Sequence, residues 1–142
     1  MKLEFSAGGV VFKKVGDHIQ ILVAKHSQHH GWVFPKGLIG DHVENEAKED
    51  TAVREVEEET GILAKILRPL EEVKYEYQFE DQKIEKTVYY FLMEYVSSDL
   101  SKKDHEMEDV AWISIDEVEN KLTYPSDKKV WEEARKLLTH DQ

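Results

Sequence analysis

Two apolar runs near the amino terminus alternate with polar positions in the manner of β-strands. Residues 3–13 and 18–25 are rich in Val, Ile, Leu and Phe, and Gly16-Asp17 between them predicts a hairpin turn. Residues 37–43 contain two glycines and have no helical period, so a loop is expected there. Further short runs predict strands at residues 32–34, 63–70, 72–79, 86–96 and 109–115.

Helical patterns occupy the remaining long segments. Residues 44–60 are dominated by Ala, Glu, Lys and Arg, and Gly61 supplies a stop signal. Asp116 is expected to cap a short helix that extends to about Leu122. Residues 126–139 have apolar side chains, including Trp131, at helical spacing, which predicts a final amphipathic helix with this tryptophan in the core. Strands before, between and after helices predict an α/β protein with a mixed sheet covered by helices.

Composition and charge narrow the classes of protein that this chain can belong to. The 142 residues suit a single domain over 1–142, and the absence of cysteine excludes disulfide scaffolds and thiolate chemistry. No targeting segment or membrane span is visible, so we expect a cytoplasmic protein. The net charge of −11 argues against nucleic acid or an anionic membrane as a partner. The sequence leaves the oligomeric state open between monomer and homodimer.

The acidic residues are concentrated in residues 37–62, which hold nine acids and two bases. Such a run is usually a solvated helix face. Here Glu55, Glu58 and Glu59 have the spacing i, i+3, i+4, which places them on one face of a helix, where they repel one another. A hard divalent cation such as Mg²⁺ or Mn²⁺ would offset this repulsion, because such ions prefer oxygen ligands. Arg54, inside the cluster, could hold a neighbouring carboxylate bidentately.

This segment resembles the signature of the Nudix hydrolases, G-x5-E-x7-R-E-U-x-E-E-x-G-U, where U is a bulky aliphatic residue. Seven residues separate Glu46 from Arg54, and every fixed position from there to Gly61-Ile62 is matched. One departure concerns the opening glycine. Pro35-Lys36-Gly37 has the family's usual turn, but eight residues follow Gly37 before Glu46, whereas Gly40 fits the count of five without that turn. We favour Gly37, with three extra residues looped out.

The resemblance implies a Nudix fold, an α/β/α sandwich, and a role for each motif position. Glu58 and Glu59 would be the main ligands of Mg²⁺, for which Mn²⁺ is a possible substitute, and the Gly37 carbonyl would be a further ligand. Glu55 would be a ligand or the base that activates water. Family members often recruit another glutamate from a later loop, where Glu106 matches and Glu108 is the alternative. The remaining implied roles are orientation of Glu55 by Arg54, bracing of the helix start by Glu46 and termination of the helix by Gly61.

Other segments are similar to the asymmetric diadenosine tetraphosphate hydrolases of this superfamily. The similar segments are Trp32 to Gly37, Tyr75-Glu76-Tyr77 and Lys86 to Phe91. Lys36 and Lys86 are candidates for binding a polyphosphate, although each could equally be a surface lysine. Tyr75 and Tyr77 share one face of a strand and could stack a purine, and Trp32 is either a base wall or core. His29 and His30 could touch phosphate but are more often simply solvated.

The most probable substrate on this resemblance is diadenosine tetraphosphate, cleaved to ATP and AMP by water attack. Other Nudix reactions remain alternatives, namely hydrolysis of an oxidised nucleoside triphosphate, of an RNA 5′-pyrophosphate or of an inositol pyrophosphate. The last ranks lowest, because the chain lacks a strong basic cluster. A nucleotide-binding Nudix module without catalysis is the alternative from another functional class, although a pure binder has no need for three convergent carboxylates.

Overall fold

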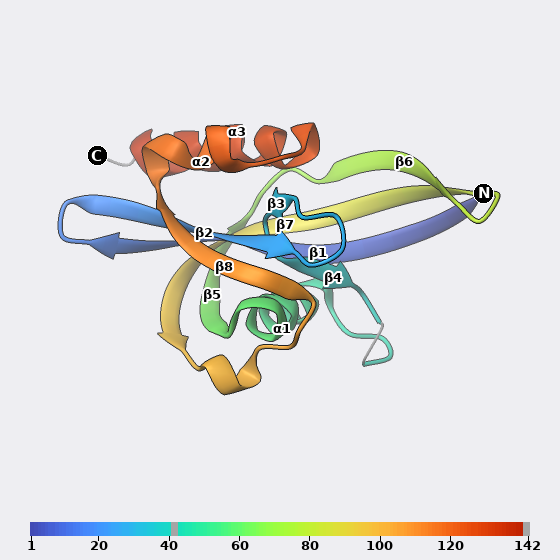
Figure 1. Ribbon diagram of the computed structural model, residues 1–142, viewed down its shortest axis with the longest axis horizontal. Helices are drawn as coiled ribbons and strands as arrows, with labels where there is room; N and C mark the ends of the chain where they lie inside the picture. The colour runs from blue at the N-terminus through green and yellow to red at the C-terminus, as the bar shows by residue number, and fades with distance from the viewer. Residues whose placement is uncertain (41–42, 141–142) are drawn as a thin grey trace.

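The computed structural model describes residues 1–40 and 43–140, which form a twisted mixed sheet with helices on both faces (Figure 1). Helix α1 (Lys48–Thr60) covers one face, and α2 (Val118–Lys121) and α3 (Pro125–His140) cover the other. The predicted α/β/α sandwich is therefore confirmed. Asp41, one of the acids counted in the sequence, lies outside the described residues. Within those residues, no helix combines the length and apolar character needed to cross a membrane.

In the described part of the chain the sheet has eight strands: β1 (Lys2–Val15), β2 (His18–His26), β3 (Trp32–Val33), β4 (Lys36–Leu38), β5 (Ile62–Pro69), β6 (Val73–Phe79), β7 (Gln82–Ser98) and β8 (Met107–Ser114). The central order is β3-β2-β1-β7-β5, while β4 pairs with β1, β6 with β7 and β8 with β2. Strands β1 and β7 run parallel and the other pairs run antiparallel, so the sheet is mixed as predicted.

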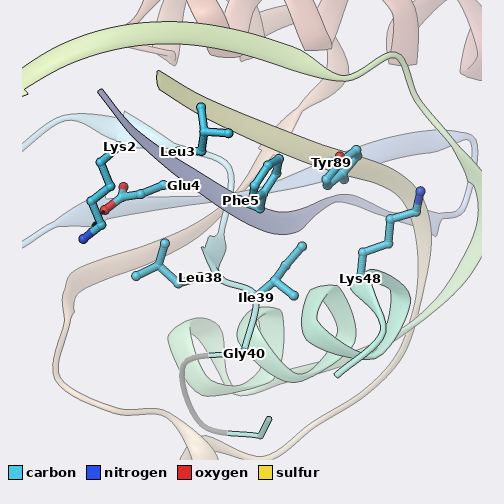
Figure 2. Close-up of a pocket in the computed structure, with 9 residues that line it drawn as sticks. All are labelled: Lys2, Leu3, Glu4, Phe5, Leu38, Ile39, Gly40, Lys48 and Tyr89. Atoms are coloured by element: carbon cyan, nitrogen blue, oxygen red, sulfur yellow. Dashed lines mark ion pairs between the residues drawn. The ribbon is translucent and has the colours of Figure 1, made fainter. Parts of the chain in front are cut away.

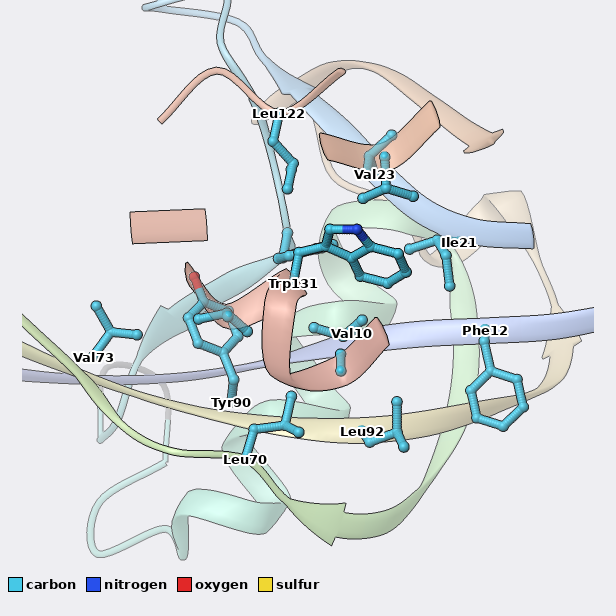
Figure 3. Packing of buried hydrophobic residues seen from close by; sticks show 14 of the residues in the cluster. Val10, Phe12, Ile21, Val23, Leu70, Val73, Tyr90, Leu92, Leu122 and Trp131 are labelled. Carbon is cyan, nitrogen blue, oxygen red and sulfur yellow. The ribbon is translucent and has the colours of Figure 1, made fainter. Parts of the chain in front are cut away.

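Alternation along β1 divides the interior into two cores. Val10 and Phe12 face the layer of α3, where they pack in one cluster with Trp131 (Figure 3). Ala7 and Val11 face the opposite layer and pack with Ala52 and Val56 of α1. Because successive strand side chains point to opposite faces, one central strand anchors both helical layers. Trp131 is 2 % exposed, in agreement with its prediction as a core residue.

Several element boundaries differ from the sequence predictions. Helix α1 begins at Lys48 rather than near residue 44, because Asn45 has a left-handed backbone with φ 62° that a helix does not admit. Part of the predicted loop at 37–43 is strand β4, whose hydrogen bonds to β1 depend on a distant segment. The helix expected from Asp116 is shorter, because a 3₁₀ turn (Ile115–Glu117) precedes α2. A further 3₁₀ turn (Leu100–Lys102) was not predicted.

Candidate functional site

Helix α1 presents its glutamates to an acidic cavity of about 300 Å³ that also contacts β4 and the segment before β8. Glu55 and Glu59 are buried in the wall of this cavity, and Glu58 is half-buried beside them. The helix ends just after these residues, because Gly61 adopts φ 77° and its N–H donates to the Glu57 carbonyl at 2.8 Å. The i, i+3, i+4 spacing seen in the sequence thus brings the three carboxylates to one cavity.

Arg54 holds the carboxylates around it with both edges of its guanidinium. Its Nε and Nη2 donate to the two carboxylate oxygens of Glu46 at 3.0 and 2.9 Å, and Nη1 donates to Glu58 Oε2 at 3.1 Å. Glu55 Oε1 lies farther off, 3.7 Å from Nη1. Thr51 Oγ1 also donates to Glu46, at 2.7 Å. Arg54 therefore fixes Glu46 and Glu58 by hydrogen bonds and acts on Glu55 mainly through its charge.

The backbone of β4 runs directly against the carboxyl groups of α1. The Lys36 N–H donates to Glu59 Oε1 at 3.1 Å. A Cβ atom built on Gly37 would lie 1.7 Å from Glu55 Oε2, so only glycine allows this approach. A Cβ on Gly40 would meet nothing within 4 Å. Gly37 is thus the glycine beside the carboxylate cluster, in agreement with the preference stated from the sequence.

The segment before β8 brings two further acidic residues, Asp104 and Glu106, to the cavity. Glu106 lines it, and the Asp104 N–H donates to the carbonyl of Glu58 at 2.6 Å, which ties this segment to α1. His26 Nε2 lies 3.6 Å from Glu106 Oε1. The alternative, Glu108, forms an ion pair with His30 and is not among the residues that line the cavity in the described structure. The geometry therefore favours Glu106 over Glu108.

Burial sets the protonation of the two most enclosed glutamates. It raises the pKa of Glu55 to about 7; Glu58 adds to the rise, and Arg54 opposes it. Burial also raises the pKa of Glu59 well above its ordinary value, and the neighbouring charge of Glu106 acts in the same direction. Ionisation of both carboxyl groups is therefore unfavourable unless a further positive charge enters the cavity.

The donor set of the cavity suits a hard divalent cation. The carboxylates of Glu55, Glu58, Glu59 and Glu106 line it. The backbone at Gly37 lies so close to Glu55 that no side chain would fit between them. Oxygen donors of this kind match Mg²⁺ or Mn²⁺ rather than Zn²⁺. In the part of the chain that the structure describes, no three His, Asp or Glu side chains stand in the arrangement of a formed metal site. The side chains would have to adjust around an ion.

A second cavity of about 450 Å³ adjoins the acidic one and shares His29, Val33 and Lys36 with it. Its remaining wall is largely aromatic and apolar, with Tyr75, Tyr90, Tyr124, Val73 and Val88. We call this second cavity the tyrosine slot. Lys36 thus contacts both spaces, and Lys86 lines the acidic cavity. Burial, with a smaller contribution from Lys36, lowers the pKa of Lys86.

Two of the predicted base-binding residues lie outside the tyrosine slot. The Tyr77 hydroxyl donates to Glu4 Oε1 at 2.6 Å, although its ring lies beside that of Tyr75. The Trp32 ring lies under Lys121, whose Nζ is 4.2 Å from the ring centroid. Neither residue is among those that line the slot or the acidic cavity in the described structure. Tyr75 alone of these three aromatic residues contributes to the slot.

Sequence reasoning missed several residues of the slot. Tyr124 immediately precedes α3 and Asp127 lies in its first turn, a segment whose pattern indicates only a helix with an acidic first turn. The Tyr124 hydroxyl lies 2.8 Å from His29 Nδ1, which also accepts the Gly31 N–H at 3.0 Å. Burial and the neighbouring His26 lower the pKa of His29. A neutral ring that accepts at Nδ1 carries its proton on Nε2, so His29 is a donor.

Another cavity, of about 580 Å³, lies where the start of β1 meets the end of β4 and Lys48 (Figure 2). Figure 2 shows Leu3, Phe5 and Tyr89 along its sheet side, with Lys48 extending from the start of α1. Among the described residues that line it, Glu4 is the only acid. This groove lacks the convergent carboxylates of the acidic cavity, so we do not assign the chemistry to it.

Comparison with known proteins identifies the family of this chain. Residues 2–137 match the family model of the NUDIX domain. The mutator protein MutT4 of Mycobacterium tuberculosis is 37 % identical over 108 residues, covering 75 % of this chain and 42 % of that protein. The chain thus spans about two fifths of the length of that relative. The asymmetrical bis(5′-nucleosyl)-tetraphosphatase of Rattus norvegicus is 34 % identical over 119 residues, covering 83 % and 78 % of the two chains.

Among solved structures, an Ap4A hydrolase of C. elegans in a binary complex has the same fold. It superposes with a TM-score of 0.71 at 20 % identity, covering 96 % of this chain and 98 % of that one. At that level of identity the likeness supports the fold alone. The match to the family model extends over nearly the whole chain, and the rat relative is similar over most of its own length. The chain belongs to the Nudix hydrolase family.

Proposed function

We propose that this protein hydrolyses a phosphoanhydride bond of a nucleoside polyphosphate with the help of Mg²⁺, and that its substrate is diadenosine tetraphosphate, cleaved to ATP and AMP. The observation that carries the proposal is the wall shared by two cavities of different chemistry. One is acidic and suits a cation, the other is aromatic and suits a nucleobase, and Lys36 and His29 line both. A nucleotide whose base occupies the slot would therefore extend its phosphates past two cationic or N–H donor groups toward the carboxylates.

Each part of the site has a distinct task in such a reaction. The tyrosines of the slot hold a base by stacking, which is worth about 1–3 kcal/mol per base and tolerates different bases. Lys36 and Lys86 bind the non-bridging phosphate oxygens, which carry the charge that the reaction must neutralise. A bound divalent ion supplies a nucleophilic water near neutral pH and further charge neutralisation.

The proton of the attacking water passes to a carboxylate that faces the acidic cavity. The family resemblance offers Glu55 and the later-loop Glu106 as the two candidates, and both line that cavity. Burial raises the pKa of Glu55 to about 7 in the ion-free protein, and a divalent cation bound nearby would lower this pKa and keep the carboxylate ionised, as a proton acceptor requires. Arg54 keeps Glu58 and Glu46 in place during these steps.

The choice of diadenosine tetraphosphate is supported by relatives rather than by geometry alone. The rat relative is named an asymmetrical bis(5′-nucleosyl)-tetraphosphatase, and the nematode structure is named an Ap4A hydrolase. A relative from Mycolicibacterium smegmatis, 28 % identical over 134 residues, is named an 8-oxo-(d)GTP phosphatase. That name favours a second candidate, hydrolysis of an oxidised nucleoside triphosphate to a monophosphate and pyrophosphate. The tyrosine slot accommodates a purine in either case.

A product assay separates the two candidates. The purified protein is incubated with diadenosine tetraphosphate or with oxidised and ordinary deoxynucleoside triphosphates, in Mg²⁺ or in EDTA, and the products are resolved by chromatography. We expect ATP and AMP in equal amounts from the dinucleotide, and only when Mg²⁺ is present. Faster release of pyrophosphate from a triphosphate would reject the dinucleotide as substrate. Binding without hydrolysis of any compound would indicate a non-catalytic module.

The acidic cavity is tested with a pair of matched variants on α1. Glu58→Gln removes one carboxylate charge from the cavity, and Glu57→Gln removes the same charge at the neighbouring position, which is not among the described residues that line it. We expect Glu58→Gln to lower kcat by at least about a hundredfold with the fold intact, since loss of a metal ligand exceeds the 10–100-fold effect of outer-shell changes. Near-wild-type turnover in Glu58→Gln would reject the metal assignment.

A further inference from the structure

Asp127 is a buried carboxylate in the wall of the tyrosine slot. It belongs to the first turn of α3, is 5 % exposed and lines the cavity together with Tyr75, Tyr90 and Tyr124. Its Oδ1 accepts two long hydrogen bonds, from the Phe34 N–H and from the Tyr90 hydroxyl, each at 3.4 Å. Both bonds end on the same oxygen, so in the described structure Oδ2 has no protein donor.

A buried carboxylate with an open oxygen is costly unless a donor reaches it, because the charge has lost much of its hydration. Burial accordingly raises the pKa of Asp127 above its ordinary value. The valines and tyrosine rings that line the rest of the tyrosine slot are apolar surfaces, so they do little to stabilise the charge of Asp127. Lys36, at the opening toward the acidic cavity, is the cation that acts on Asp127. A ligand that brings an N–H group to Oδ2 would therefore relieve this cost.

We propose that Asp127 is the specificity-determining residue of the slot and accepts a hydrogen bond from the exocyclic amine of an aminopurine such as adenine. The assignment rests on the proposed function, because it places the base of the nucleotide in the slot and its phosphates at Lys36. A carboxylate accepts hydrogen bonds and donates none, so it favours an amine over a ring edge that carries only acceptors. Stacking on tyrosines tolerates any base, so selectivity must come from a polar group of this kind.

The first experiment compares two ligands that differ only in that amine. Adenosine and purine riboside, each as the 5′-monophosphate, are titrated into the wild-type protein by calorimetry, and their dinucleoside tetraphosphates are compared by kcat/KM. We expect a preference of about tenfold or more for the amino compound in both measurements, the range for a hydrogen bond to a charged group. Equal affinity for the two monophosphates in the wild-type protein overturns the proposal without any variant.

The second experiment uses Asp127→Asn, which keeps the side-chain shape. The amide oxygen remains able to accept the Phe34 N–H, so the amide NH₂ faces the slot and opposes an exocyclic amine. We expect the preference for the amino compound to fall to one or below, while purine riboside monophosphate binds as well as before. Glu132→Gln, on the exposed side of the same helix, is the matched control and should retain the wild-type preference. An unchanged preference in Asp127→Asn overturns the proposal.

The binding measurement keeps this proposal separate from the proposed hydrolysis. If the protein binds adenosine monophosphate with the expected preference but cleaves no polyphosphate, the assignment of Asp127 stands and the reaction is wrong. If it cleaves diadenosine tetraphosphate in Mg²⁺ but does not distinguish the two bases, the reaction stands and Asp127 has only a packing role at the start of α3.

Discussion

Arg54 organises more of the acidic cavity than any one of its glutamates does. Its guanidinium holds both oxygens of Glu46 and one oxygen of Glu58, so three hydrogen bonds on one planar group fix two carboxylates. The bond to Glu46 raises the pKa of Arg54 above its ordinary value, which keeps the guanidinium charged. A single ammonium group cannot replace these three hydrogen bonds of the planar guanidinium, although it carries the same charge.

The variant Arg54→Lys tests this role. We expect kcat/KM to fall by about 10–100-fold, the effect of losing a group that orients metal ligands, because lysine cannot bind Glu46 and Glu58 together. Steady-state kinetics and thermal unfolding measure the change. The conservative control is Arg135→Lys on the exposed side of α3, which should behave as the wild type. Wild-type activity in Arg54→Lys would mean that charge alone suffices.

The variant Gly37→Ala tests the close approach of the β4 backbone to the Glu55 side chain of α1. In Gly37→Ala the added Cβ would lie 1.7 Å from Glu55 Oε2, so the carboxyl group or the strand must move. We expect activity to fall by at least about tenfold, since small displacements of reacting groups are costly. Gly40→Ala has free space around the Cβ but a backbone φ of 81°, so it should lose about 1 kcal/mol of stability and keep its activity. The reverse result would make Gly40 the equivalent glycine.

At the level of single residues, the sequence predicts what depends on local spacing. Glu55, Glu58 and Glu59 converge because three positions on one helix share a face, and no distant contact is needed for that. Tyr124 and Asp127 reach the slot only because α3 packs across the sheet, and nothing in their own segment indicates this. Trp32 was an open choice between base wall and core, and its contact with Lys121 depends on the position of α2.

Among elements, α1 was the easiest to predict and its flanks the hardest. Its composition and the stop at Gly61 are local signals, and the helix ends there. Its start was predicted four residues too early, because the left-handed Asn45 interrupts a helix-favouring composition. Strand β4 escaped prediction because its three residues are defined by pairing with β1, not by their own pattern. The segment before β8 is likewise shaped by long-range bonds, such as that from the Asp104 N–H to the carbonyl of Glu58.

The role of the segment before β8 is tested by comparing the variants Glu106→Gln and Glu108→Gln. Both variants remove one charge, but only Glu106 lines the acidic cavity, while Glu108 is paired with His30 at the surface. We expect kcat to fall by about 10²-fold or more in Glu106→Gln, the range for a group that transfers protons, and to stay within twofold in Glu108→Gln. Single-turnover kinetics at saturating Mg²⁺ measure the chemical step. A larger loss in Glu108→Gln would reassign the late carboxylate.

For the whole molecule, the distribution of charge matters more than its sum. The net charge of −11 taken alone argues against an anionic substrate, but nine acids and two bases fall within residues 37–62. Part of that segment lines one cavity, and Lys36 and Lys86 line the same cavity. Ions bound at such a site are the largest local charges and can reverse the sign of the local potential. A polyphosphate can then bind to a protein whose overall charge would repel it.

Removal of the divalent ion should therefore abolish binding of the phosphates but spare binding of the base. A non-hydrolysable dinucleoside tetraphosphate should lose at least about a hundredfold in affinity when EDTA replaces Mg²⁺, because the carboxylates of the acidic cavity then repel the phosphates at close range. Uncharged adenosine, which on the proposed function would occupy only the tyrosine slot, should bind equally well in both conditions. Calorimetry at constant ionic strength measures both ligands and removes the effect of general screening. Equal affinity of the tetraphosphate with and without Mg²⁺ would show that the lysines bind the phosphates alone and that the acidic cavity holds no ion in the complex.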